Sequence, residues 1–262
     1  MFQVGDIMKK LFLFMAVFSM IGGHAYAEPS KLDKVLESKN LRVCTTGDYK
    51  PYTFRKSDGT YEGIDISMAN SLAATLNVKV TFVPTTWKTL MDDFLADKCD
   101  IAMGGISISL ARQQKAYMSE PLDVDGKVPF VRCEDKDKYD TIEKLNQKDV
   151  RAIEPAGGTN EAFVHKFMPQ AQLELFHDNT VIFQNLVDMK ADVMITDASE
   201  ARYQKRYYPT LCVVNPDVPL LFLEKAYMLP KGDLTWKFYV DQWLRLTKKN
   251  GEYNLIQAEW FK

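Results

Sequence analysis

The chain has 262 residues, of which 46% are hydrophobic, so it can bury the core of one large domain or of two smaller ones. Its 33 lysine and arginine residues nearly balance its 35 aspartate and glutamate residues, which gives a formal net charge of −2. A chain this close to neutral lacks the basic excess that a nucleic-acid partner needs, and its composition excludes an intrinsically disordered chain.

The N-terminal segment has the pattern of a secretory signal peptide. Lys9 and Lys10 precede an apolar run over residues 11–21, and the small-residue sequence Ala25-Tyr26-Ala27 follows. This run is too short for a membrane span, which needs about 20 residues. We therefore predict a signal peptide over residues 1–27, cleaved after Ala27, and a mature chain that lies in the periplasm without a membrane anchor.

The exported part of the chain contains all four cysteines, which are Cys44, Cys99, Cys133 and Cys212. An even number of cysteines in an oxidising compartment favours disulfides, and four cysteines allow three pairings. Buried free thiols are the alternative. No C-x-x-C motif is present, so a redox motif or a zinc site of that kind is not expected.

Apolar periodicity and turn signals predict a first series of elements. Strands are expected over residues 41–45, 79–83 and 100–103, a hairpin turn at Asp58-Gly59, and helices over 64–76 and 89–96. A second series is expected to begin near Lys127. It has strands over 128–132, 150–153, 173–176, 192–196 and 221–229, and helices over 161–167, 180–189, 198–207 and 236–249.

This alternation predicts an α/β fold with mostly parallel sheets that are covered by helices on both faces. Because the C-terminal part is expected to return to the first series, we predict two lobes joined by crossovers near residues 121–125 and 215–220. Lobe 1 would comprise residues 28–121 and 220–262, and lobe 2 residues 122–219. A small-molecule ligand would bind in the cleft between the lobes, where strand ends and helix N-termini meet.

Two strand-to-helix turns are candidate anion sites. In the first, Gly158, Thr159 and Asn160 open a helix whose free N–H groups attract an anion, such as a carboxylate, although a simple helix cap is the alternative. The segment is not a P-loop, because the G-K-[ST] ending is missing. In the second turn, Gly105 and Ser107 follow a strand.

Arg112 comes one turn after this second segment. Arginine binds carboxylates through two parallel hydrogen bonds, so Arg112 is a candidate ligand for a substrate carboxylate. An exposed surface arginine is the alternative interpretation.

Three aromatic residues, Tyr49, Tyr52 and Trp87, lie in loops after expected strands. They could wall an apolar pocket, or they could serve local packing alone. Asp197 and Glu200 have the i, i+3 spacing that places both carboxylates on one helix face, at a strand-to-helix turn, so they are candidate functional residues. The alternative is a capping arrangement at the helix start.

Other catalytic patterns are missing from the sequence. There is no G-x-S-x-G, no H-E-x-x-H and no cluster with metal-ligand spacing. We therefore expect a site without a metal or a cofactor, in which any chemistry depends on carboxylates, hydroxyl groups and arginine.

The segment Gly63-Ile64-Asp65-Ile66-Ser67-Met68, followed by Leu72-Ala73, resembles a motif of the type 3 family of periplasmic solute-binding proteins, which bind polar amino acids. The resemblance covers residues 32–251 and implies a two-lobed, hinged periplasmic-binding-protein fold of type II. It also implies that Arg112 and Thr159 hold a ligand carboxylate, that Asp197 takes an amino group, and that Tyr52 stacks on the ligand.

Within this family the chain resembles the cyclohexadienyl dehydratases over residues 45–51, 84–87, 157–161, 196–202, 224–227 and 239–244. The resemblance implies a cofactor-free lyase of phenylalanine biosynthesis that converts prephenate to phenylpyruvate, arogenate to phenylalanine, or both. It implies that Glu200 is the general acid and that Cys133 pairs with Cys212. Pro155 stands where this group would be expected to carry an asparagine near the site.

The alternative function is a non-catalytic amino-acid-binding component of an ABC transporter, with the transporter permease as its partner. In that case Glu200 would cap a helix or contact a cationic ligand side chain. The choice between prephenate and arogenate stays open at this point, as does assembly into a homo-oligomer.

Overall fold

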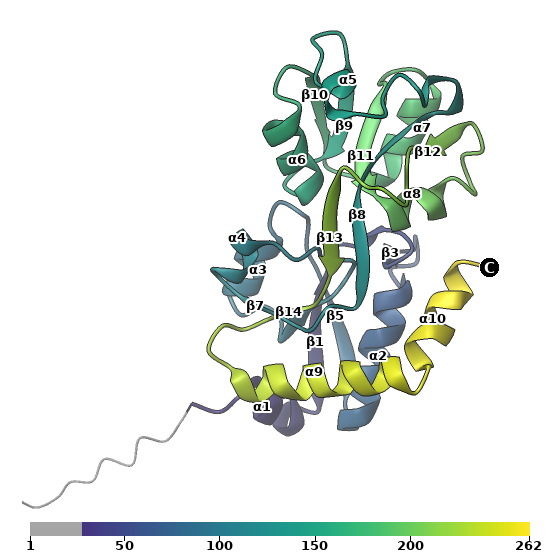
Figure 1. Cartoon of the computed structure of the whole chain (residues 1–262). Helices are drawn as coiled ribbons and strands as arrows, with labels where there is room; N and C mark the ends of the chain where they lie inside the picture. Colours follow the sequence, from purple (N-terminus) through teal and green to yellow (C-terminus); the bar gives the residue numbers. More distant parts are fainter. Residues whose placement is uncertain (1–27) are drawn as a thin grey trace, which may run out of the picture.

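The computed structural model describes residues 28–262, so the predicted signal peptide lies outside the described residues. The chain forms two α/β lobes, one above the other in Figure 1. Each lobe has its own sheet with helices around it, and a hydrophobic cluster lies on either face of each sheet. This is the two-lobed α/β fold predicted from the alternation of strands and helices. The prediction of mostly parallel sheets is wrong, because the sheet of each lobe combines parallel and antiparallel pairings where the chain returns along the crossing strands.

The lobe 1 sheet has the order β5-β1-β6-β14-β7. The parallel strands are β1 (Asn40–Thr45), β5 (Lys79–Pro84) and β6 (Ile101–Ala102), while β14 (Met228–Leu229) lies antiparallel to both β6 and β7 (Tyr117–Met118). One face packs on α2 (Ile64–Leu76), α9 (Leu234–Lys249) and α10 (Glu252–Trp260), with α1 (Lys31–Ser38) beside α9. The other face packs on α3 (Leu90–Leu95), and α4 (Leu110–Gln113) precedes β7.

A small antiparallel sheet extends lobe 1 toward the other lobe. It consists of β2 (Asp48–Tyr49), β3 (Thr53–Arg55) and β4 (Tyr61–Glu62). The turn between β3 and β4 contains Asp58-Gly59, as the hairpin signal predicted. This sheet carries Tyr49 toward the space between the lobes.

The lobe 2 sheet has the order β10-β9-β11-β8-β12. Its strands are β8 (Asp123–Arg132), β9 (Arg151–Pro155), β10 (Gln172–Phe176), β11 (Val193–Asp197) and β12 (Leu211–Val213). A short 3-10 turn, η1 (Cys133–Asp135), follows β8. Side chains of α7 (Ile182–Val187) and α8 (Ala198–Gln204) pack in one cluster, and those of α5 (Ile142–Leu145) and α6 (Thr159–Phe167) pack in the other.

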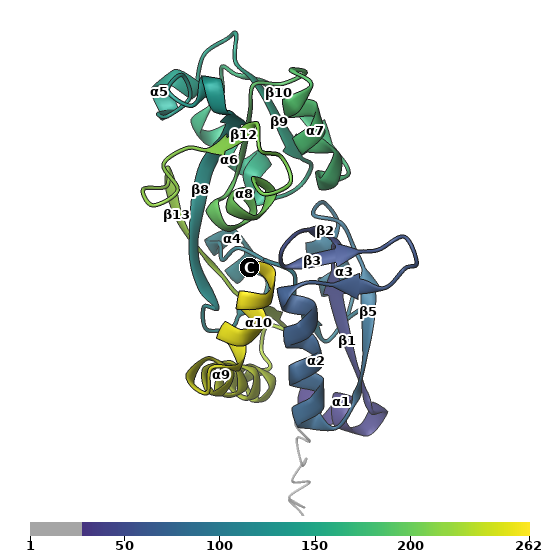
Figure 2. The ribbon, with the colours of Figure 1, turned by 90° about the vertical axis from the view of Figure 1, so that its right-hand side faces the viewer.

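Two antiparallel strands run side by side between the lobes, as Figures 1 and 2 show for β8 and β13 (Leu221–Lys225). The lower half of β8 pairs with β13, and its upper half pairs with β11 and β12. The returning connection is thus strand β13 itself, which follows the predicted range 215–220. The residue boundaries of the two lobes stay a prediction.

Three expected elements differ in detail. The strand expected over 221–229 is two strands, β13 and β14, because the chain passes from one sheet to the other at Ala226-Tyr227. The helix expected over 180–189 consists of a 3-10 turn, η2 (Asn179–Val181), followed by α7. The helix expected over 198–207 ends at Gln204.

Both pairs of cysteines form disulfides, Cys44 with Cys99 in lobe 1 and Cys133 with Cys212 in lobe 2. The second pairing is the one that the family resemblance implied. The alternative of buried free thiols is wrong, because no cysteine is left unpaired.

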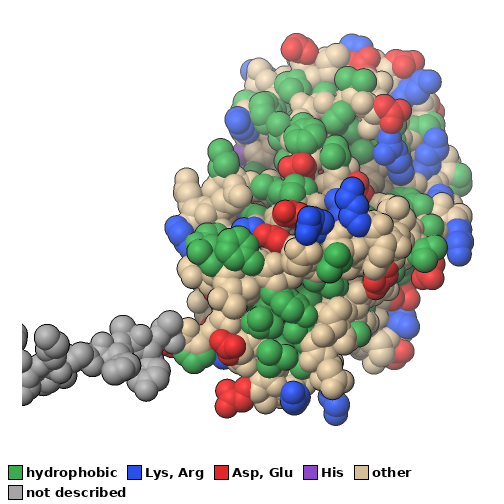
Figure 3. Space-filling view, turned by 60° about the horizontal axis from the view of Figure 1, so that its bottom comes forward, with side chains coloured by type: hydrophobic (Ala, Val, Ile, Leu, Met, Phe, Trp, Pro, Cys, Tyr) green, Lys and Arg blue, Asp and Glu red, His purple; other side chains and the backbone are tan. Residues whose placement is uncertain are grey.

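The surface carries charges of both signs. In the view of Figure 3, basic and acidic side chains are interspersed with groups of hydrophobic ones. Within residues 28–262, no helix combines the length and the apolar character that crossing a membrane requires.

Candidate functional site

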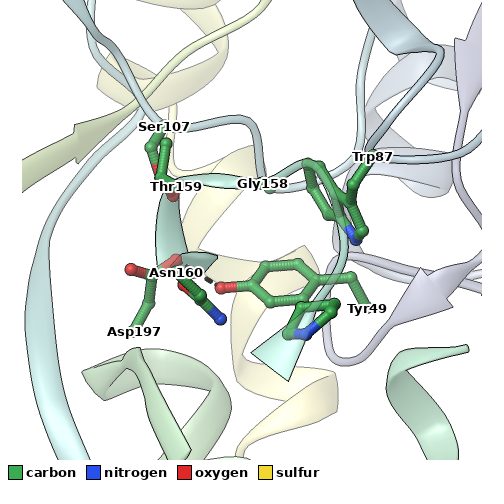
Figure 4. A pocket seen from close by; sticks show the side chains of 9 residues that line it. Tyr49, Trp87, Ser107, Gly158, Thr159, Asn160 and Asp197 are labelled. Atoms are coloured by element: carbon green, nitrogen blue, oxygen red, sulfur yellow. Dashed lines mark hydrogen bonds between the residues drawn. The ribbon is translucent and has the colours of Figure 1, made fainter. Parts of the chain in front are cut away.

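A small cavity of about 20 Å³ lies between the two lobes. Its wall is formed by residues of both lobes, most of which Figure 4 labels: Tyr49, Trp87, Gly105, Ser107, Pro155, Gly158, Thr159, Asn160 and Asp197. Most of them follow the carboxyl end of a strand or open a helix, which is where ligands bind in α/β folds. Eight of the predicted site residues are therefore brought together at one place.

The lobe 1 wall is aromatic. The Tyr49 ring meets the edge of the Trp87 ring with centroids 5.4 Å apart, and Tyr52 stacks behind Tyr49 at 5.7 Å. Gly105 makes this packing possible, because a Cβ there would lie 2.6 Å from the Tyr49 ring and its φ of +69° suits glycine. Tyr52 is almost fully buried and supports Tyr49 from behind, so it does not line the cavity.

The lobe 2 wall contains a helix start and a strand end. Gly158 is the N-cap of α6 and has no side-chain capping bond, so the first N–H groups of the helix are available to an anion. Thr159 and Asn160 form the first turn of this helix. Thr159 and, from lobe 1, Ser107 both line the cavity, as Figure 4 shows. This corner of the cavity can bind a carboxylate.

Asp197, at the end of β11, is the charged centre of the site. It is 2% exposed and lies between two lysines, Lys127 and Lys225, that are themselves fully buried. The Lys127 Nζ is 2.7 Å from Oδ1, and the Lys225 Nζ and the Tyr49 hydroxyl both donate to Oδ2. Burial alone would raise the pKa of Asp197, but the two ammonium groups hold it well below its usual range.

Lys225 also joins the two lobes. It ends the crossing strand β13, and its ammonium group donates to the Gly105 carbonyl at 3.0 Å and to the Ser107 hydroxyl at 3.2 Å. Both of these partners belong to lobe 1, whereas Asp197 belongs to lobe 2. The ion pair between Lys225 and Asp197 is therefore a contact across the cleft.

Glu200 is completely buried in the first turn of α8, one turn after Asp197. Its carboxyl group accepts hydrogen bonds from the Thr196 hydroxyl and, at 2.7 Å, from Asn179 Nδ2. Burial and, as a smaller effect, the charge of Asp197 raise the pKa of Glu200 to about 8, although these two hydrogen bonds act to lower it. Glu200 is thus mostly protonated at neutral pH, and it lies beside the cavity without lining it.

Arg112 does not line the cavity either. Its Nη1 donates to the Ser107 carbonyl at 2.6 Å, and its side chain borders a neighbouring surface pocket together with Trp87 and Gly157. Arg112 therefore holds the loop that carries Ser107, and it lies at the edge of the site.

Several functional candidates escaped the sequence analysis, above all the buried lysines Lys127 and Lys225. Asp65 is another: its carboxylate accepts from the Gly105 N–H at 2.6 Å and from the Tyr227 hydroxyl at 3.0 Å, and burial raises its pKa to about 6. Glu154 is fully buried next to Pro155, with one carboxyl oxygen bound by the Ile195 N–H. For Lys127, Lys225 and Glu154 the available signal was a charged residue in a strand with apolar neighbours, whereas Asp65 lies in the first turn of α2.

Nowhere in the described part of the chain do three or more His, Cys, Asp or Glu residues gather as metal ligands would. The groups that surround the cavity are carboxyl, ammonium, hydroxyl and aromatic groups. They can bind carboxylates, enclose a ring and supply a proton.

Comparison with known proteins places this site in context. Residues 41–262 match the family model of bacterial extracellular solute-binding proteins, family 3. The chain is 48% identical over 236 residues to a cyclohexadienyl dehydratase from Pseudomonas aeruginosa, an alignment that covers 90% of this chain and 88% of that protein.

Two solved structures are also similar over nearly their whole length. An ancestral amino acid-binding protein, described as a precursor of cyclohexadienyl dehydratase, has 35% identity and a TM-score of 0.83, with coverage of 89% of this chain and 100% of that one. An ancestral cyclohexadienyl dehydratase has 47% identity and a TM-score of 0.57, with coverage of 91% and 99%.

Proposed function

Because the chain belongs to family 3 of the bacterial extracellular solute-binding proteins, we propose that it carries out on this fold the reaction of its enzymatic relatives, as a cyclohexadienyl dehydratase. The observation that carries the proposal is the 48% identity over 90% of the chain to the enzyme from Pseudomonas aeruginosa. The fold alone does not decide, since receptors and enzymes share it. The substrate is prephenate, arogenate or both.

The reaction is an elimination driven by aromatisation. The bond between the ring and its carboxylate breaks, and the electron pair moves into the ring. The carbon–oxygen bond of the ring hydroxyl breaks at the opposite side, and the departing oxygen takes up one proton. Prephenate and a proton thus yield phenylpyruvate, carbon dioxide and water. The enzyme has to hold carboxylates, exclude water and deliver that proton.

Glu200 is the proposed proton donor. A carboxyl group with a pKa of about 8 is protonated at neutral pH, and Glu200 lies one turn from Asp197, beside the cavity. General acid assistance of this kind contributes about 10²–10⁴-fold to a rate. The N–H groups at the start of α6 and the hydroxyl groups of Ser107 and Thr159 would hold a carboxylate, while Tyr49 and Trp87 enclose the ring.

The substrate reaches this site when the lobes separate. A cavity of about 20 Å³ has room for one or two water molecules and not for a ring with two carboxylates. Asn179 also links the lobes, because its Nδ2 donates both to Glu200 and, at 3.3 Å, to the Asp48 carbonyl of lobe 1. Opening the lobes would break this link and expose the Glu200 carboxyl group to the substrate.

The decisive experiment is turnover of prephenate by the purified mature chain, followed by the absorbance of phenylpyruvate. We expect turnover by the wild type and a loss of about 10²–10⁴-fold in kcat in Glu200→Gln, because the amide cannot donate the proton in the same way. Glu174→Gln, an exposed glutamate on β10, is the matched control and should keep full activity. Full activity in Glu200→Gln would remove Glu200 from the mechanism.

A second candidate function is a receptor that delivers an amino acid to a transporter permease. The similarity to the ancestral amino acid-binding protein favours it. This function predicts no turnover of prephenate or arogenate, together with thermal stabilisation by a basic amino acid such as L-arginine. Turnover without stabilisation by L-arginine would exclude the receptor.

The proposal includes export to the periplasm and cleavage of the signal peptide after Ala27. Membership of a family of extracellular proteins supports export. The measurement is the intact mass and N-terminal sequence of the protein expressed with its leader, which should begin at Glu28. A product that retains residues 1–27 would contradict the proposed cleavage.

A further inference from the structure

Two neighbouring strands of the lobe 2 sheet, β9 and β11, separate where they reach the cavity. Their pairing is confined to Ala152 and Val193. Beyond this pair, β9 continues beside β10 as far as Pro155, and β11 continues beside β8 as far as Asp197. Because Pro155 and Asp197 both line the cavity, the split between the two strands lies in the lobe 2 wall of the site.

The Glu154 side chain links the two sides of this split. Glu154 belongs to β9, one residue before Pro155, and is completely buried. Its Oε1 accepts a hydrogen bond at 2.6 Å from the Ile195 N–H of β11. A side-chain carboxyl group thus satisfies an N–H that a main-chain carbonyl would bind in a continuous ladder. Where the backbones of the two strands no longer pair, one side chain connects them.

Glu154 forms this hydrogen bond as an uncharged acid. Burial raises the pKa of its carboxyl group well above the usual range, and the Ile195 N–H and the ammonium group of Lys127 on β8 offset only part of this effect. The carboxyl groups of Glu200 on α8 and Asp197 on β11 raise it further, to a smaller extent. Within residues 28–262 the buried Oε2 of Glu154 has no hydrogen-bond partner, so a charge there would not be compensated.

The end of β11 that Glu154 holds carries both carboxyl groups of the site. Thr196 and Asp197 follow Ile195 directly in the chain. The Thr196 hydroxyl donates to Glu200, and Asp197 lines the cavity. The hydrogen bond between Glu154 and the Ile195 N–H therefore fixes the strand end from which these groups reach the site.

We infer that Glu154 is a positioning residue of the proposed reaction: through the Ile195 N–H it fixes the end of β11, and with it the place of the acid Glu200 beside the substrate. Glu154 itself does not line the cavity. The inference rests on the proposed function and adds to it a residue that acts through a backbone hydrogen bond. Pro155 has neither an N–H nor a polar side chain to support the cavity wall, and the neighbouring Glu154 supplies that support.

The test is the kinetics of prephenate turnover after substitution of Glu154. Glu154→Gln keeps an uncharged acceptor of the same size, and its kcat should stay within about twofold of the wild type. Glu154→Asp shortens the side chain by one methylene group, and Glu154→Leu removes the acceptor. Both should lower kcat by about tenfold or more, because a displacement of about 1 Å near the reacting groups has at least this effect. Their KM should change by less than about threefold, because the start of α6 still holds the carboxylate.

Thr247→Val is the matched control for a loss of stability. Thr247 is buried in α9 of lobe 1, where its hydroxyl group donates to the Trp243 carbonyl at 2.9 Å. This substitution also removes one buried hydrogen bond, so it should lower the melting temperature and leave kcat at the wild-type value. An equal fall of kcat in Thr247→Val and in Glu154→Leu, at a matched loss of stability, would reduce Glu154 to a structural role and overturn the inference.

Glu154→Leu leaves the Ile195 N–H buried without a partner and can fail to fold, so the other two substitutions carry the test by themselves. Wild-type kcat in Glu154→Asp would show that the reach of the side chain is not needed, and would overturn the inference. A large loss of kcat in folded Glu154→Gln, or a shifted basic limb of its pH profile, would mean that Glu154 acts through its charge and would overturn it as well. A wild type that turns over neither prephenate nor arogenate would instead overturn the proposed function, on which the inference rests.

Discussion

At the scale of single residues, the site depends on where charge is tolerated in the interior. Asp197 keeps its charge because two lysines face it, whereas Glu200, with only a hydroxyl and an amide as partners, has its pKa raised by burial to about 8. Two carboxyl groups one helical turn apart thus differ in protonation at neutral pH. When the pKa values of two neighbouring carboxyl groups differ in this way, the ionised group can bind or position a partner and the protonated group can donate a proton.

This divergence predicts a pH dependence of stability. The native state keeps the Glu200 proton up to about pH 8, while the unfolded state loses it near the ordinary value of 4.5. Between these values the unfolded state binds fewer protons, so Glu200 lowers the free energy of unfolding as pH rises, by up to about 1.4 kcal/mol per pH unit.

The measurement is urea unfolding of the wild type and of Glu200→Gln from pH 5 to pH 8. The difference between their free energies of unfolding should shift in favour of Glu200→Gln as pH rises. It should change little above about pH 8, where Glu200 ionises in both states. A difference that stays constant from pH 5 to pH 8 would show that Glu200 titrates normally.

At the scale of elements, the crossing strands do more than connect the lobes. β8 and β13 pair from Asp123–Lys225 to Lys127–Leu221, so each contributes one lysine to the same carboxylate. Lys127 comes from the end of the paired segment in lobe 2, and Lys225 from the end that faces lobe 1. A relative movement of these two strands would therefore change the charge around Asp197, which couples the hinge to the site.

At the scale of the whole molecule, the cleft closes through close backbone contact at Gly157. A Cβ at Gly157 would lie 2.3 Å from the Cα of Lys88 in lobe 1, and Gly157 has a φ of +89°. We expect Gly157→Ala to hold the lobes apart, to lower kcat/KM for prephenate at least about tenfold because water is no longer excluded, and to enlarge the radius of gyration measured with phenylpyruvate bound.

The matched control for this substitution is Gly232→Ala. Gly232 has a similar φ of +94°, but no atom lies within 4 Å of the position of a Cβ there. The two variants therefore share the backbone strain, and only Gly157→Ala has the clash between the lobes. If both variants had the same activity and dimensions, contact at Gly157 would have no part in closure.

Features that depend on interactions between residues close in the sequence could be predicted, whereas features that depend on contacts between distant segments could not. Helix α2 was predictable from Ile64, Met68, Leu72 and Leu76, whose spacing already specifies one buried face. The strand expected over 221–229 was broken where the chain changes sheets, because apolar character does not encode a change of partner. Tyr52 and Arg112 were candidates for the cavity wall, but Tyr52 packs behind Tyr49, and Arg112 in α4 donates to the Ser107 carbonyl, so neither lines the cavity.

The sequence by itself determined the α/β alternation, the turns at strand ends and eight residues of the cavity wall, because glycines, helix starts and apolar periodicity act locally. Only the tertiary structure decided the charge of the site. Lys127 and Asp197 are 70 positions apart and meet through the pairing of β8 with β11, and Lys225 reaches them from β13. From the sequence alone, a lysine in a strand is expected to be exposed to solvent, because lysines are seldom fully buried without a partner. The strand pairing supplies that partner, a buried carboxylate.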